Sequence, residues 1–232
     1  MALLILAGLL WAVFGRAPDT VSGAGMIVPA GGFVDIGTSV SGRVTQVLVG
    51  PGDRVEKGQP VATLASGDGA VEQVLATVPG TVATIVARQG GTTEPGTPLL
   101  TIDPATTDVA IGFLPAAQGG QVRTGMAAEV SVASFPRSQY GYITGTVKSV
   151  ALLPATFDRI QLLVGGNDRL PEYFTASGPV VEVTVALDVD ADTASGYAWT
   201  TGDGPPDKVF TGELASVFVI ISDRRPIERI TG

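Results

Sequence analysis

The sequence of 232 residues contains neither histidine nor cysteine. Without these residues no Ser-His-Asp or Cys-His catalytic system can be built. Zinc fingers, haem ligated through histidine or cysteine, and cysteine-ligated iron–sulfur clusters are excluded as well. Disulfide bonds are impossible, so cysteine gives no information about the redox compartment. Any catalysis would have to use carboxylates, lysine, tyrosine or a metal held by oxygen ligands.

Basic residues are scarce. Lysine and arginine number 14 against 22 aspartates and glutamates, which gives a net charge of −8. Because the lysines lie far apart and no basic cluster exists, we expect no nucleic-acid partner. The chain has 31 glycines and 16 prolines and is rich in valine and threonine. This composition favours short strands joined by turns, and hence a mainly β fold.

The N-terminal segment at 1–15, MALLILAGLLWAVFG, carries no charge. Trp11 and Phe14 near its end are typical of a membrane interface, but a spanning helix needs about 20 residues. We therefore expect an incomplete transmembrane anchor whose first residues lie upstream of Met1. A signal peptide is the alternative. The segment lacks the basic start of a signal peptide, and Pro18 directly after the small-x-small triplet Gly15-Arg16-Ala17 makes a poor cleavage site. A third alternative is a buried core helix, but such a helix would lie at the extreme terminus of the chain and would have no polar face to expose to water. Either membrane interpretation places the bulk of the chain outside the cytoplasm.

The first half of the sequence contains an internal repeat. Residues 40–64 and 78–102 align without a gap, so that the first repeat begins at Val40 and the second at Val78. We predict structural turns at three glycines in each half: Gly42, Gly52 and Gly58, and Gly80, Gly90 and Gly96. The identical pairs are Val40/Val78, Gly42/Gly80, Val44/Val82, Gly52/Gly90, Glu56/Glu94, Gly58/Gly96, Pro60/Pro98 and Thr63/Thr101.

Each repeat predicts three or four short strands with one apolar face, which neither half could bury alone. Two such halves related by a pseudo-twofold axis can pack into a flattened β-sandwich. The pattern resembles the half-motif of the biotinyl/lipoyl domain. A carrier of this kind would need a lysine in the hairpin at residues 65–77, and none is present. We therefore expect a scaffold use of this fold and no cofactor.

The second half predicts a β-barrel domain with one or two short helices. A helix is expected over Thr156–Val164, with Phe157, Ile160, Leu163 and Val164 on its core face. The predicted domains are an anchor at 1–15, a linker at 16–36 with a strand leading into the sandwich, the lipoyl-like domain at 37–104, and the barrel at 105–232. The predicted barrel strands are Val109–Phe113, Ala127–Ala133, Tyr142–Val150, Val180–Leu187 and Ala215–Ile221.

Few residues in the second half suggest a site. Asp188, Asp190 and Asp192 match the start of a calcium loop, but Thr193 stands where glycine is required and Trp199 where a bidentate glutamate is needed. We predict neither a metal site nor catalytic residues. Tyr140, Tyr142, Tyr197 and Trp199 are possible partner contacts. The alternative for each is packing against the barrel, with Tyr140 and Tyr142 sharing one face of a strand.

An apolar N-terminus, a split lipoyl-like domain and a second β domain resemble the HlyD family of membrane fusion or periplasmic adaptor proteins. Residues 23–36, GAGMIVPAGGFVDI, look like that family's strand from membrane to lipoyl domain. Many members carry a coiled-coil hairpin between the lipoyl halves. Here the short segment 65–77 alone separates Leu64 from Val78, and no heptads occur. We therefore expect no coiled-coil hairpin, and this departure from the family argues against direct docking to a TolC-like channel, while the use of an outer-membrane channel stays open.

Five segments of the second half carry a further resemblance, namely FLPAAQGGQVRTGM at 113–126, FPRSQYGYITGTVKSVALLPAT at 135–156, SGPVVEVTVAL at 177–187, SGYAWTTGDGPP at 195–206 and RRPIE at 224–228. Through them this half is similar to the HlyD-like secretion proteins of NHLM bacteriocin systems. The resemblance implies a non-catalytic, single-pass adaptor in the inner membrane, oligomeric and mostly periplasmic. Its partner would be an ABC exporter, often with a leader-peptidase domain, and its cargo a ribosomally made peptide. The alternative is an extracytoplasmic ligand-binding or envelope-structural β protein that reuses the lipoyl fold.

Overall fold

The computed structural model describes residues 17–67, 69–104 and 106–224, which form two compact units. In sequence, the two units interrupt one another: residues 28–108 of the sandwich unit follow the first barrel strand, and residues 157–171 lie between the fourth and fifth barrel strands. The sandwich unit comprises residues 28–108 and 157–171, and the described part of the barrel unit comprises 17–27, 109–156 and 172–224.

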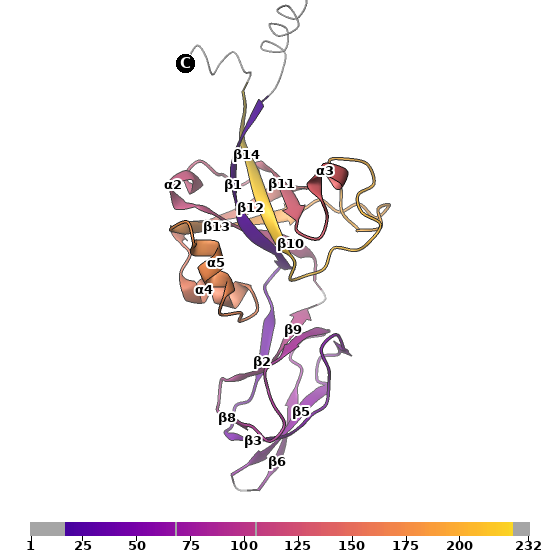
Figure 1. Ribbon diagram of the computed structural model, residues 1–232. Coiled ribbons are helices and arrows are strands. Elements are labelled where there is room, and N and C mark those ends of the chain that lie inside the picture. Colours follow the sequence, from indigo (N-terminus) through magenta and orange to yellow (C-terminus); the bar gives the residue numbers. More distant parts are fainter. Residues whose placement is uncertain (1–16, 68, 105, 225–232) are drawn as a thin grey trace, which may run out of the picture. The chain divides into compact units, whose positions relative to one another are not determined.

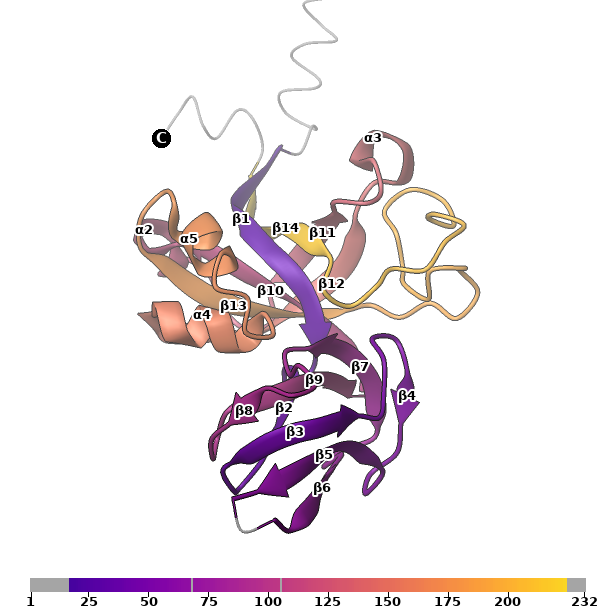
Figure 2. The ribbon, with the colours of Figure 1, turned by 60° about the horizontal axis from the view of Figure 1, so that its bottom comes forward.

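Within the described part of the sandwich unit, short strands form two four-stranded sheets (Figure 2). Their orders are β2-β9-β7-β4 and β6-β5-β3-β8. The strands are β2 (Val34–Gly37), β3 (Gly42–Val47), β4 (Arg54–Val55), β5 (Pro60–Ser66), β6 (Val71–Leu75), β7 (Gly80–Ile85), β8 (Thr92–Thr93) and β9 (Pro98–Pro104).

The sequence repeat is also a repeat of the structure. The shift that carries Val40 onto Val78 also carries β2, β3, β4 and β5 onto β6, β7, β8 and β9, and it turns the order of one sheet into that of the other. The irregularities repeat too, since β3 shifts register between Val44 and Gln46, and β7 between Val82 and Thr84. The predicted lipoyl-like sandwich of two related halves is confirmed.

The two sheets bury a shared apolar core. Leu64 and Ile102 are equivalent under the repeat and both are 0 % exposed. Burial of one such side chain contributes about 1.5–3 kcal/mol, so the core accounts for the pairing of the halves. The buried members are Ile36, Val44, Val55, Val61, Ala62, Leu64, Val74, Ala76, Val82, Leu99, Leu100 and Ile102.

Described strands of the second unit close a barrel in the order β1-β10-β13-β12-β11-β14 (Figure 1). The predicted barrel is confirmed, and each predicted strand is present, with only its ends displaced in some cases. The strands are β1 (Ala17–Pro29), β10 (Asp108–Pro115), β11 (Ala127–Val132), β12 (Ile143–Pro154), β13 (Val180–Leu187) and β14 (Leu214–Arg224).

A strand is present within residues 16–36, as predicted, but its assignment to a linker is wrong, because β1 is a strand of the barrel. It pairs with β14 in antiparallel fashion and lies beside β10. Gly23 and Gly25 allow that approach, since a Cβ on them would lie 2.1 Å from the carbonyl oxygen of Phe113 and 2.2 Å from that of Ile111. The packing of β1 against β10 therefore requires glycine at both positions.

The described helices are short. They are α2 (Ala116–Gly119), α3 (Arg137–Tyr140), α4 (Phe157–Leu163) and α5 (Leu170–Thr175). The helix predicted over Thr156–Val164 corresponds to α4, and Ile160 and Leu163 are buried as expected. Two details differ from the prediction: Phe157 is 46 % exposed, and α4 belongs to the sandwich unit instead of the barrel domain.

The membrane anchor predicted at residues 1–15 lies outside the described residues. Within residues 17–67, 69–104 and 106–224, no helix has both the length and the apolar character needed to cross a bilayer.

Candidate functional site

The hairpin between β5 and β6 is where a biotinyl or lipoyl carrier would bear its lysine. Here the two strands pair as far as Ala65 and Val71, and Ser66 N–H donates to the carbonyl of Ala70 at 2.8 Å. The sequence of the tip and its flanks, residues 65–77, contains no lysine. These residues therefore do not fit covalent attachment of biotin or lipoate. Because the two strands pair up to this short turn, no coiled-coil hairpin is inserted between β5 and β6.

Four of the six predicted turn glycines occupy left-handed backbone conformations. Gly52 and Gly58 have φ of +88° and +86°, and their equivalents Gly90 and Gly96 have +82° and +81°. The hydrogen bonds are equivalent as well: Gly52 N–H donates to the carbonyl of Val82 at 2.8 Å, and Gly90 N–H donates to that of Val44 at 2.7 Å. These four glycines therefore have a structural role: their left-handed conformations form turns, and the hydrogen bonds of Gly52 and Gly90 connect the two halves of the sandwich.

Turns predicted at Gly42 and Gly80 are wrong. These glycines are the first residues of β3 and β7. A Cβ on Gly80 would lie 2.1 Å from the carbonyl oxygen of Asp103, and one on Gly42 would lie 2.8 Å from that of Ala65. Close approach between neighbouring strands, and not a turn conformation, requires glycine at both positions.

Two of the four aromatic residues proposed as partner contacts meet on the barrel unit. The ring of Trp199 lies 6.4 Å from that of Tyr140, and Phe135 lies 6.0 Å from Tyr140 and 6.2 Å from Trp199. All three pairs have edge-to-face geometry, which stabilises aromatic pairs in this distance range. The cluster ties the loop that carries Trp199 to α3 and to the end of β11.

Tyr197 and Trp199 both pack against the barrel core. Trp199 Nε1 donates to Oγ of Ser195 at 2.8 Å, and a Cβ on Gly204 would lie 2.3 Å from Cδ1 of the indole. A hydrogen bond to the indole nitrogen and glycine against the ring fix the indole in place. This geometry supports the structural alternative for Tyr197 and Trp199, while their partly exposed surfaces leave room for a contact.

Tyr140 and Tyr142 do not share a strand face, contrary to the prediction. Tyr140 ends α3, Gly141 follows with φ of +75°, and β12 begins only after Tyr142. The ring of Tyr142 lies 5.4 Å from that of Phe218 on β14. The two tyrosines are therefore separated by a sharp turn and contact different neighbours.

The three aspartates after β13 serve the loop in which they lie. Oδ2 of Asp188 accepts a hydrogen bond from Oγ1 of Thr144 at 2.8 Å, and Oδ1 of Asp190 accepts one from the backbone N–H of Asp192 at 3.0 Å. Within the ranges that the structure describes, no group of three or more acidic, histidine or cysteine residues is placed to hold a metal ion.

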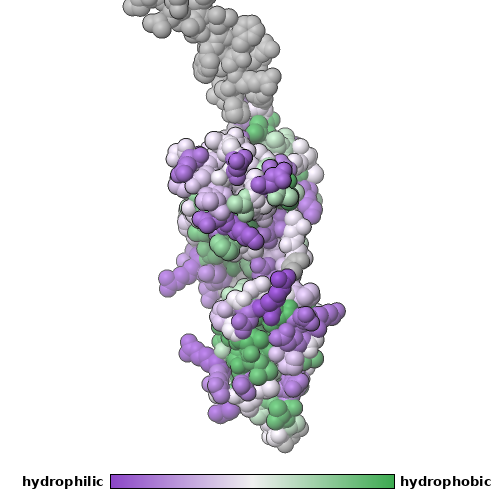
Figure 3. Space-filling model, turned by 90° about the vertical axis from the view of Figure 1, so that its right-hand side faces the viewer, coloured by the Kyte–Doolittle hydropathy of each residue, from purple (hydrophilic) through white to green (hydrophobic). Residues whose placement is uncertain are grey.

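Both units expose apolar side chains that the sequence did not single out. Figure 3 shows hydrophobic surface gathered on one face of the sandwich unit. The exposed large apolar residues of this unit include Leu48, Val71, Leu75 and Val86. Val71 and Leu75 lie on β6, an outer strand of its sheet. Exposed apolar surface that extends over neighbouring residues is typical of protein-binding faces.

The geometry thus defines a class of fold: a lipoyl-type sandwich whose hairpin segment 65–77 has no lysine, joined in one chain to a six-stranded barrel. Residues 32–102 match the family described as "Biotin-requiring enzyme". Among curated proteins, no sequence matches that of the chain.

Solved structures share this layout over most of the chain. MacA from Actinobacillus actinomycetemcomitans is similar with a TM-score of 0.62 and 12 % identity, over 91 % of this chain and 81 % of that one. ZneB from Cupriavidus metallidurans gives 0.58 and 12 %, over 88 % and 98 %. The membrane fusion protein Spr0693 from Streptococcus pneumoniae R6 gives 0.50 and 13 %, over 88 % and 99 %. At this identity the likeness concerns the fold.

Proposed function

We propose that the chain is a non-catalytic adaptor, or membrane fusion protein, of an ABC-type exporter that secretes a ribosomally made, bacteriocin-like peptide. Residues 1–15 anchor it in the inner membrane as a single span, and both described units lie outside the cytoplasm. Several copies assemble beside the exporter. The exporter carries the leader-peptidase activity, because this chain has neither the cysteine nor the histidine for it.

One observation carries the proposal: a lipoyl-type sandwich without a lysine at residues 65–77 is joined to a barrel, in a layout similar to that of a membrane fusion protein over 88 % of the chain. A sandwich without an attachment lysine lacks the chemistry of a carrier but keeps a rigid two-sheet scaffold. Rigid elements with exposed apolar surface suit the holding of other proteins. The absence of coiled-coil heptads favours an adaptor that does not reach a distant channel.

The peptide cargo and the NHLM type of system rest on the sequence segments of the second half. Two of these segments have a physical role in the fold. The segment at 195–206 contains Ser195, Trp199 and Gly204, which lock the loop onto the barrel. The segment at 135–156 contains Tyr142 and all of β12. These two segments therefore have a structural role in the barrel, and the proposed subtype rests on their sequence resemblance.

Deleting the gene in the producing cell tests the function. We expect secretion of the mature peptide to stop, while the purified transporter still removes the leader. The reason is that the adaptor assists transport of the peptide and takes no part in cleaving its leader. Re-expression of the intact chain should restore secretion. The same chain without residues 1–15 should not restore it if these residues anchor the adaptor. Unchanged secretion in the deletion strain would contradict the proposal and favour a ligand-binding or envelope-structural role.

A further inference from the structure

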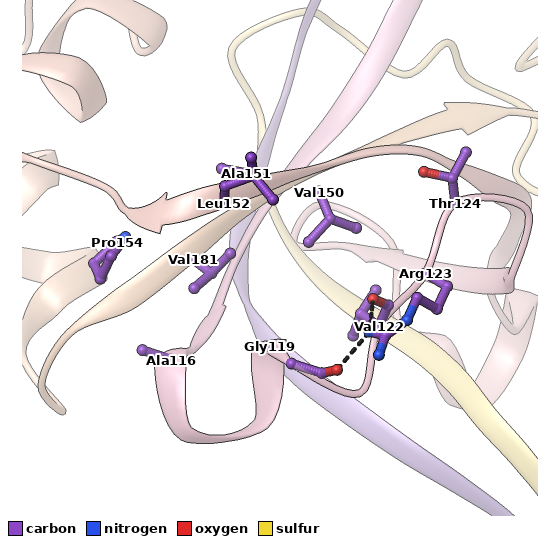
Figure 4. A pocket seen from close by; sticks show the side chains of 11 residues that line it. Ala116, Gly119, Val122, Arg123, Thr124, Val150, Ala151, Leu152, Pro154 and Val181 are labelled. Carbon is purple, nitrogen blue, oxygen red and sulfur yellow. Dashed lines mark hydrogen bonds between the residues drawn. The ribbon is translucent and has the colours of Figure 1, made fainter.

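The barrel unit contains an open groove of about 510 Å³ beside β12. Figure 4 shows residues of β12 on one side of this groove, and residues of α2 and the segment after it on the other. Its walls are mostly apolar. The lining residues are Ala116, Gly119, Gly120, Val122, Arg123, Thr124, Val150, Ala151, Leu152, Pro154 and Val181.

One wall of the groove is the edge of a strand without a neighbour. β12 pairs with β11 only from Ile143 to Thr146, and after a hydrogen bond from Gly125 N–H to the carbonyl of Val147 no described strand continues on that side. On its other side β12 remains paired with β13 as far as Pro154. The residues of β12 after Val147 therefore present an unpaired edge to the groove. Such an edge is a template for an added strand.

A bulge pushes apolar side chains outward at this edge. Val150 pairs with Val183 and Pro154 with Val181, so residues 151–153 stand opposite one residue of β13. Leu152, which lines the groove, is 99 % exposed, and its neighbour Leu153, which does not line it, is 76 % exposed. A leucine left fully in water beside an apolar groove loses the stabilisation that burial would give.

Arg123 gives the groove its charge. It is the only charged side chain among the described residues that line the groove, in a chain of net charge −8. Its Nη1 donates to the carbonyl of Val122 at 2.8 Å and to that of Gly120. These bonds hold the guanidinium to its own loop, and within the described ranges no acceptor contacts its remaining N–H donors. A guanidinium held in this way suits a carboxylate, which it can bind with two hydrogen bonds.

We propose that this groove binds an extended segment of a partner protein that carries an acidic residue between apolar residues. The segment adds as a strand to the free edge of β12, its carboxylate pairs with Arg123, and an apolar side chain packs against Val122, Val150 and Leu152. Unpaired backbone groups, apolar walls and a single fixed cation together select this chemistry. The inference holds for the barrel unit whether or not the chain serves an exporter.

Peptide binding to the intact chain in mild detergent tests the groove. One fluorescein-labelled peptide alternates valine and threonine around a central glutamate, and a matched peptide has lysine in its place. At about 0.1 M salt we expect the glutamate peptide to bind about tenfold more tightly, because the carboxylate pairs with Arg123. The variant R123Q should reduce this preference to about twofold or less.

Two pairs of variants separate groove binding from adhesion to any exposed leucine. L152S should weaken binding of both peptides, whereas L153S should not, because only Leu152 lines the groove. R88Q, on an exposed arginine of the sandwich unit, should change nothing. Equal binding of the two peptides, or equal effects of L152S and L153S, would overturn the proposal. Self-association that R123Q and L152S abolish would overturn it in favour of a second copy as the occupant.

Discussion

The two halves of the sandwich have the same architecture and differ in their core residues. Both have the same strand order, the same register shifts and the same left-handed glycines. Most of the other paired positions differ in sequence. Four of the eight identical pairs are glycine or proline, whereas most core pairs, such as Leu64/Ile102, repeat only in their apolar character. Backbone requirements are therefore the stricter of the two kinds of constraint on this fold.

One equivalent pair shows where the second half is weaker. Val55 is an apolar core residue with 1 % exposure, and its counterpart Thr93 is buried at 6 %. Among the described residues, Oγ1 of Thr93 has no hydrogen-bond partner. A buried hydroxyl without a partner loses its hydration and gains nothing in return. The difference predicts that stability is distributed unequally between two halves with the same backbone.

Truncating the central core residues should give the largest effect and test the symmetry directly. L64A and I102A should each lower the free energy of unfolding by about 3 kcal/mol, because each leaves a cavity at an equivalent, fully buried position. Hydrogen exchange of the sandwich strands in the intact chain measures both changes. A cost for one variant several times that for the other would show that the halves are not equivalent in their packing.

The strand-initial glycines should break the symmetry. In G80A the new methyl group would meet the carbonyl oxygen of Asp103 at 2.1 Å and Cγ2 of Ile102 at 2.7 Å. In G42A it would meet the carbonyl oxygen of Ala65 at 2.8 Å, and the nearest side-chain atom, Cβ of Leu64, is 3.6 Å away. We expect a loss of about 2–3 kcal/mol for G80A and about 1 kcal/mol for G42A. Denaturation of both variants with urea provides the comparison, and the reverse order would contradict it.

Exchanging the residues of the pair Val55 and Thr93 should give the smallest effect, and it tests most specifically whether the second half is the less stable one. T93V should raise the free energy of unfolding by about 1 kcal/mol, because it removes an unpaired hydroxyl from the core at nearly constant volume. V55T, the reciprocal change, should lower it by a similar amount. Exchange rates in β4 and β8 would show both shifts. Destabilisation by T93V would mean that the hydroxyl has a stabilising partner after all.

The sequence predicts the sandwich well because its determinants are local. Gly52 and Gly58 recur as Gly90 and Gly96 at a fixed shift. A turn at a glycine that precedes a strand can be predicted from neighbouring residues alone. The strand Val180–Leu187 is likewise predicted to the residue by its apolar alternation.

The remaining features depend on residues far apart in the chain. β1 pairs with β14, and Met26 lies opposite Leu214, so no local pattern identifies it as a barrel strand. The requirement for glycine at Gly23 and Gly25 is also not visible locally, because the backbone of β10 that they approach lies more than 80 residues further along the chain. The groove also escapes prediction, since Arg123 and Leu152 line it together only because β11 begins at Ala127, opposite Thr146, and leaves the rest of β12 unpaired on that side.

Recovery of the partner from the native membrane tests the adaptor function most directly. The intact chain, tagged and expressed in its own cells, would be purified in mild detergent and its companions identified by mass spectrometry. The account predicts an ABC transporter among them, present in the preparation of the intact chain and lost from that of the chain without residues 1–15. Recovery of the intact chain without any transporter would contradict the account.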